Sequence, residues 1–86
     1  MNKSELETAI MIELGMSDYK LWTIGITEDS QRRKGELEAT GEDVKHWRDW
    51  KADSEDIARS VEASFLHQGM KGGTSDGDHP THVYIF

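Results

Sequence analysis

Three aliphatic residues spaced four apart predict a first helix over residues 5–14. Ser4 and Glu7 have the spacing of a capping box, in which each side chain accepts a hydrogen bond from the backbone N–H of the other residue. Gly15 is a stop signal at the other end of this helix. The aliphatic residues, which would form its buried face, are Leu6, Ile10 and Leu14.

Two further helices are expected after residues that suit the N-cap position, because their side chains can accept hydrogen bonds from the first backbone N–H groups. Asp29 or Ser30 would cap a helix that runs to about residue 39. The pair Asp53-Ser54 would cap a third helix that runs to about residue 67.

Alternation of side chains predicts a strand over residues 20–27, in which every second residue from Trp22 faces the core. Another strand is expected over residues 47–52. A last strand is expected over residues 82–86, where apolar residues on both faces indicate a central position. The predicted fold is α+β, with a small, mainly antiparallel sheet of about three strands flanked by three helices.

The second face of the first expected strand is thin. Thr23 and Gly25 leave the backbone open to close approach by another group, which makes both of them candidate binding residues.

The composition limits the classes of protein to which this chain can belong. Its 86 residues are expected to form one domain, residues 1–86. The absence of cysteine excludes disulfides and thiolate zinc sites. The first residues lack the long apolar run of a signal peptide or a membrane span, so we expect a cytoplasmic protein with no membrane partner.

The formal net charge of −7 opposes nonspecific binding to nucleic acid. Any such contact would be local, through the basic cluster Arg32, Arg33 and Lys34. These residues stand in the first turn of the second expected helix, where the exposed N–H groups and the helix dipole favour an anion. A solvated surface is the alternative interpretation of this cluster.

Glu62 occupies an unusual position on the third expected helix. At about 100° per residue, it falls inside the buried arc, between Ala58 and Leu66. An ionised carboxylate there needs a cation, a hydrogen-bond donor or solvent. Three interpretations follow: an ion pair with Arg33 or Lys20, a metal or phosphate site, and extension of the side chain to the edge of the arc.

The segment Thr23-Ile24-Gly25, with Arg33 ten positions after Thr23 and Glu62 on a later helix, resembles the GIY-YIG nuclease superfamily. The resemblance covers about residues 20–66, and the final strand extends it. It implies that Glu62 holds Mg²⁺ or Mn²⁺, that Arg33 stabilises the transition state, and that a tyrosine helps to activate water.

Both motif tyrosines of that family are absent. The tyrosine of the second motif is replaced by Thr23, and the position of the first falls near Ile12, inside an expected helix. Tyr19, at the start of the strand, is the alternative phenol. We therefore expect a degenerate GIY-YIG-like domain that binds a partner protein or a phosphodiester, with little or no nuclease activity.

Two other functions stay open at the level of the sequence. One is an active metal-dependent endonuclease that uses Glu62 and Arg33. The other is a protein-interaction module whose acidic surface meets a basic partner. The glycine-rich segment 69–78 is expected to be a loop, and the acidic and histidine residues near it are interpreted as loop composition rather than a metal site. These residues are Asp76, Asp78, His79 and His82.

Overall fold

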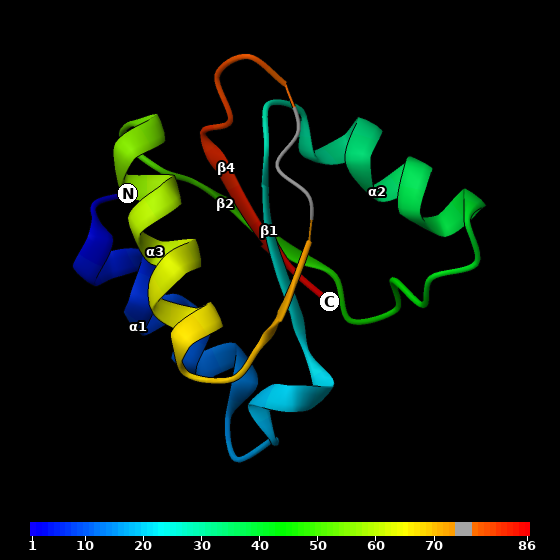
Figure 1. The fold of residues 1–86 in the computed structure, drawn as a ribbon, viewed down its shortest axis with the longest axis horizontal. Helices are drawn as coiled ribbons and strands as arrows, with labels where there is room; N and C mark the ends of the chain where they lie inside the picture. Colours follow the sequence, from blue (N-terminus) through cyan, green and yellow to red (C-terminus); the bar gives the residue numbers. More distant parts are fainter. Residues whose placement is uncertain (74–76) are drawn as a thin grey trace.

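The computed structural model describes residues 1–73 and 77–86. Its centre is a four-stranded sheet in the order β2-β4-β1-β3. Figure 1 shows this sheet nearly edge-on, with α1 and α3 on one face and α2 on the other. The helices are α1 (Lys3–Leu14), α2 (Ser30–Ala39) and α3 (Glu55–His67), and a 3₁₀ turn covers Tyr19–Leu21. The strands are β1 (Thr23–Thr27), β2 (Arg48–Lys51), β3 (Lys71–Gly72) and β4 (His82–Ile85).

The sheet confirms the α+β class and corrects its details. β4 pairs antiparallel with both β1 and β2, and is central as expected. β3 adds a fourth strand, within the segment expected to be a loop, and pairs parallel with β1. The sheet in the described residues is therefore mixed, and it has four strands, one more than the sequence predicts. A strand of two residues has no alternation to detect, so only its pairing reveals it.

The three α-helices lie where the sequence predicts them, and the start of α1 differs in its cap. The side chain of Asn2 accepts a hydrogen bond from the Glu5 N–H at 2.9 Å. The Glu5 carboxylate accepts one in return from the Asn2 N–H, also at 2.9 Å. This capping box replaces the expected box of Ser4 and Glu7, and it begins the helix two residues earlier.

One face of the sheet forms the apolar core, which α1 and α3 cover. The core is built from aliphatic residues of both helices and from alternate residues of the strands. Its fully buried members include Leu6 and Ile10 of α1, Ile24 and Ile26 of β1, Val61 and Phe65 of α3, and Val83 and Ile85 of β4.

The other face of the sheet, under α2, has a different character. Tyr84, Gly25 and Thr27 are buried here, and α2 itself buries only Ser30. Little of α2 is therefore buried against the sheet. Among the described residues, no helix is long and apolar enough to cross a membrane.

Candidate functional site

Tyr84 lies at the centre of the face that α2 covers. It is fully buried and directly opposite Gly25 on the neighbouring strand. A Cβ atom added at Gly25 would overlap the Tyr84 phenol, and one added at Gly73 would lie 2.9 Å from the Tyr84 hydroxyl oxygen. The space beside the β1 backbone at Gly25 is therefore occupied by the side chain of Tyr84.

Aromatic stacking fixes the ring of Tyr84 from the other side. The Trp47 ring is nearly parallel to it, with centroids 4.6 Å apart and an interplanar angle of 9°. The Trp47 indole N–H donates to Asp49 Oδ2 at 2.6 Å, which in turn fixes the indole. Because the phenol is fully buried and stacked on Trp47, its hydroxyl is held in place.

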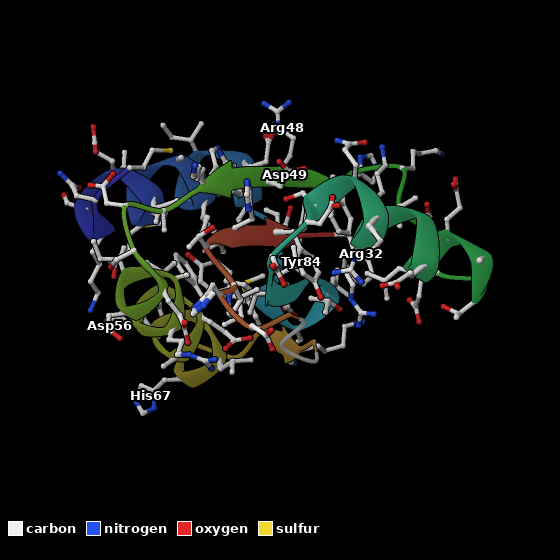
Figure 2. The ribbon with its side chains drawn as sticks, turned by 90° about the horizontal axis from the view of Figure 1, so that it is seen from above. Arg32, Arg48, Asp49, Asp56, His67 and Tyr84 are labelled. Atoms are coloured by element: carbon white, nitrogen blue, oxygen red, sulfur yellow. The ribbon has the colours of Figure 1, made fainter. Side chains whose placement is uncertain are left out.

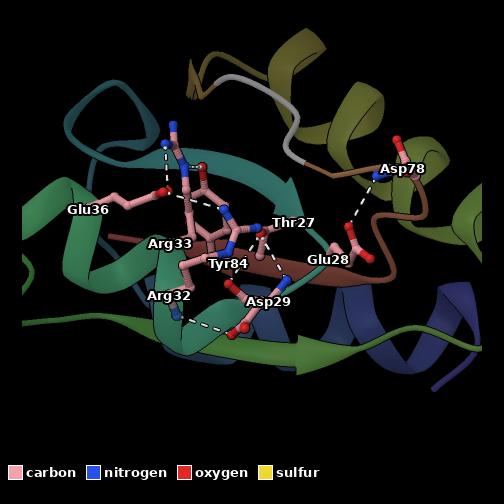
Figure 3. A network of polar contacts seen from close by, with 8 residues as sticks. All are labelled: Thr27, Glu28, Asp29, Arg32, Arg33, Glu36, Asp78 and Tyr84. Atoms are coloured by element: carbon pink, nitrogen blue, oxygen red, sulfur yellow. Dashed lines mark hydrogen bonds and ion pairs between the residues drawn. The ribbon is translucent and has the colours of Figure 1, made fainter.

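That hydroxyl lies beside Arg33 of α2. The Arg33 Nε–H donates to the Tyr84 hydroxyl oxygen at 3.4 Å, and Arg33 Nη1 lies 3.4 Å from Glu36 Oε1 (Figure 3). The side chain of Arg33 is only 20% exposed. The guanidinium is therefore held against this face of the sheet and is not freely solvated.

Arg32, its neighbour in the basic cluster, is more exposed than Arg33, whereas Lys34 is half-buried. Arg32 pairs with Glu36 at 3.3 Å and is 44% exposed. Its backbone N–H donates to the Asp29 side chain, which caps α2. Glu36 thus offsets part of the positive charge that the basic cluster places against the helix dipole.

Glu62 lies on α3, the helix that packs on the opposite face from α2 (Figure 1). It is half-buried and makes no hydrogen bond or ion pair with any described residue. Lys20, one of its expected partners, lies 3.8 Å from Asp18. Burial raises the pKa of the Glu62 carboxyl, and the Arg59 guanidinium opposes this. Contacts among the described residues therefore do not join Glu62 to Arg33.

Tyr19 and Thr23 have structural surroundings of their own. Tyr19, in the 3₁₀ turn, packs against Phe65 of α3 with ring centroids 6.2 Å apart, on the core side of the sheet. The backbone of Thr23 exchanges two hydrogen bonds with Phe86, at 2.7 and 3.0 Å. The phenol that accompanies Arg33 is thus Tyr84, a residue of the last predicted strand that the sequence pattern did not single out. Its position opposite a strand glycine is the signal that would have identified it.

A cavity of about 650 Å³ opens beside the first turn of α2. Two of the residues that line it carry a buried atom, Ser30 Oγ and His82 Nδ1, with no hydrogen-bond partner among the described residues. Such atoms cost about 1–3 kcal/mol each when left unpaired. Ser30, His82 and Asp49 line the same cavity but are not hydrogen-bonded to one another, so they do not form a catalytic triad. The residues that line the cavity are Glu28, Asp29, Ser30, Gln31, Arg32, Asp49 and His82.

His79 precedes β4, and His82 is its first residue. No group of three or more His, Cys, Asp or Glu side chains within residues 1–73 and 77–86 could hold a metal ion. His79 is exposed and lies 3.7 Å from Glu55, while His82 belongs to β4. Asp76 lies outside the described residues.

No protein-family model, curated protein or solved structure matches this chain.

Proposed function

We propose that this chain is a degenerate, cytoplasmic GIY-YIG-like domain that binds a phosphodiester and does not cleave it efficiently. The main support is the position of Arg33, whose guanidinium the Tyr84 hydroxyl and Glu36 hold in place. A positioned guanidinium suits phosphate because its N–H groups match the oxygen atoms in pairs. The net charge of −7 makes this a local contact rather than an extended one.

Weak or absent cleavage follows from the separation of charges. Hydrolysis of a phosphodiester with a metal requires a carboxylate ligand beside the transition-state cation. Arg33 belongs to α2 and Glu62 to α3, and these helices cover opposite faces of the sheet. A protein partner that presents a phosphate-like acidic group would use the same guanidinium.

An active endonuclease is the second candidate, and one observation favours it. Tyr84 brings a phenol beside Arg33, although Thr23 replaces the tyrosine of the second motif. This reading still requires Glu62 to hold Mg²⁺ or Mn²⁺ near the phosphate.

The test is binding of a short fluorescent DNA oligonucleotide at low salt, with and without Mn²⁺. Arg33→Gln should weaken binding by about tenfold, which corresponds to about 1.4 kcal/mol. Tyr84→Phe should weaken it less, because it removes only the hydroxyl that holds Arg33. Arg59→Gln is the matched control, because Arg59 is an exposed arginine of α3 that pairs with Glu55.

Equal weakening by Arg33→Gln and Arg59→Gln would contradict the proposal, because binding would then follow total charge alone. Cleavage of the oligonucleotide that requires Mn²⁺ and disappears in Glu62→Gln would instead establish the endonuclease.

A further inference from the structure

A second hollow, of about 410 Å³, lies at the end of the sheet where β1 begins and β4 ends. Leu21 and Trp22 line it from the chain that leads out of the 3₁₀ turn into β1. Phe86, the residue after β4, adds a third large apolar side chain, and His46 adds another ring. We call this hollow the aromatic groove. It shares no lining residue with the cavity beside the first turn of α2.

The large apolar side chains of the aromatic groove are accessible to a partner. Leu21 is 72% exposed, and Trp22 and Phe86 are half-buried. Phe86 also extends the stack of Trp47 and Tyr84, with its ring centroid 5.8 Å from that of Trp47. Large apolar side chains are scarce in a chain of 86 residues. Three of them left accessible around one hollow are typical of a surface that contacts another protein.

Backbone hydrogen bonds hold both sides of the aromatic groove in place. The Lys71 N–H donates to the Trp22 carbonyl oxygen at 2.9 Å, which joins the start of β3 to the residue before β1. The Glu42 N–H donates to the Leu37 carbonyl oxygen at 3.1 Å, which fixes the chain after α2. A groove that is already formed loses little conformational entropy when a ligand binds.

The charged side chains at the aromatic groove favour a basic partner. Glu42 and Asp43, which follow α2, line it together with Lys71. Carboxylates therefore exceed lysine and arginine side chains among its described lining residues. Glu42 and Asp43 are exposed, and neither forms an ion pair with a described residue. The net charge of −7 adds attraction for a cationic partner at longer range.

We propose that the aromatic groove docks a short segment of a partner protein in which a large apolar residue stands beside arginine or lysine. The apolar side chain packs against Leu21, Trp22 and Phe86. The basic side chain pairs with Glu42 or Asp43, and it is attracted to the face of the Trp22 ring. Nucleic acid suits the groove less well, because carboxylates repel phosphate groups.

This docking surface goes beyond the proposed phosphodiester contact, because neither Arg33 nor Tyr84 lines the groove. The Trp22 indole N–H is an internal NMR reporter for the test, since Trp22 lines the groove. Trp50 does not line it, and its indole serves as the reference in the same spectrum.

The probe is a capped pentapeptide of glycine at both ends and leucine at the centre, with an arginine on each side of the leucine. In one control peptide, glutamates replace both arginines. In the other, alanine replaces the leucine. An oligonucleotide of single-stranded thymidines is the probe for the competing class of partner.

We expect a saturable shift of the Trp22 indole resonance with the arginine peptide and none of the Trp50 indole. Glutamates in place of the arginines should weaken binding at least about tenfold, because they meet Glu42 and Asp43. Alanine in place of the leucine should weaken it at least about fivefold, because less apolar area is buried.

Two variants of the protein test the two parts of the groove. Leu21→Ser should weaken binding of the arginine peptide at least about threefold. Its matched control is Ile12→Ser on α1, because Ile12 is 74% exposed and lies outside the groove. Glu42→Gln should weaken binding about threefold. Its control is Asp56→Asn, an exposed carboxylate of α3 (Figure 2). All four positions are exposed, so the thermal midpoints should stay close to that of the parent.

Arg33→Gln should leave peptide binding intact, which separates this surface from the phosphodiester contact. The absence of a saturable Trp22 shift at millimolar peptide would overturn the proposal. Equal binding of the arginine and glutamate peptides, or equal effects of Leu21→Ser and Ile12→Ser, would overturn it as well. A Trp22 shift caused by the oligonucleotide and not by the arginine peptide would assign the groove to nucleic acid instead.

Discussion

The two faces of the sheet are built from alternate residues of the same strands, yet they differ in chemistry. On the face covered by α1 and α3, Ile24, Ile26 and Val83 join a continuous apolar core. On the face covered by α2, Tyr84 is buried between glycines and beside a guanidinium. Figure 2, seen from above, shows α1 and α3 on one side of the strands and α2 on the other.

In this small protein, one face of the sheet therefore carries the apolar core, and the other carries the positioned polar side chains. The apolar face can be closed by aliphatic residues of many shapes, because burial of apolar area is not directional. The polar face depends on individual contacts, such as the Arg33–Tyr84 hydrogen bond, and it holds both unpaired buried atoms of the described residues. Unpaired atoms and positioned charges are typical of binding sites.

The largest effect is expected from removal of the central ring of each face. Tyr84→Ala and Phe65→Ala should each lower the free energy of unfolding by about 3–5 kcal/mol, because both side chains are fully buried. Urea unfolding measures this. Only Tyr84→Ala should also disturb the Arg33 side-chain resonance. A loss below about 1 kcal/mol for Tyr84→Ala would mean that the α2 face contributes little packing.

A smaller effect is expected where a methyl group meets the phenol. Gly25→Ala should destabilise the protein by about 1–3 kcal/mol, since its Cβ would overlap the stacked Tyr84 ring. Gly35→Ala is the matched control in the interior of α2, where an added Cβ meets nothing within 4 Å. It should stabilise by about 0.5–1 kcal/mol through helix propensity. Thermal unfolding of both variants tests the contrast, and similar results for the two would contradict it.

The smallest effect is expected at the edge of the apolar face. Burial raises the pKa of Glu62 above 4.5, so its contribution to stability falls as pH rises from 4.5 through the raised pKa. Glu62→Gln should therefore match or exceed the parent at neutral pH, by less than about 1 kcal/mol, and should flatten the stability curve above pH 4.5.

Glu55→Gln is the control of opposite sign for the Glu62 experiment. The hydrogen bond from Arg59 lowers the pKa of Glu55, so its stabilising contribution is present above pH 4.5 and is lost as pH falls through the lowered pKa. Urea titrations over about pH 2.5 to 8 compare the two variants, because the Glu55 contribution is lost only at the acidic end of this range. A parent curve that Glu62→Gln leaves unchanged would show that burial does not affect this carboxyl.

The apolar face could be predicted from the sequence, because its signals are local and periodic. Leu6, Ile10 and Leu14 recur at helical spacing, and all three are buried. The strand over residues 20–27 alternates, and β1 lies inside it. The N-cap residues Asp29 and Ser54 were also identifiable, since capping depends on near neighbours.

The polar face could not be predicted in the same way, because its contacts join distant parts of the chain. Tyr84 and Arg33 are 51 positions apart, and each looks ordinary alone. Tyr84 sits in an apolar strand, and its role depends on Gly25 being directly opposite. β3 is recognisable only through its pairing with β1. The helical angle of Glu62 placed it inside the buried arc, whereas the structure leaves it half-buried, and the angle could not show which face α3 would cover.

The position of β4 also determines how the sheet can form. β1 and β2 are not neighbours in the sheet. Each pairs with β4, which follows both of them along the chain. Neither β1 nor β2 can therefore complete its pairing until β4, which ends at residue 85, has been synthesised. Closing such distant segments is slow. Until then, both strands have open edges that can pair with other chains, so the late pairing of β4 leaves this small domain open to aggregation while it folds.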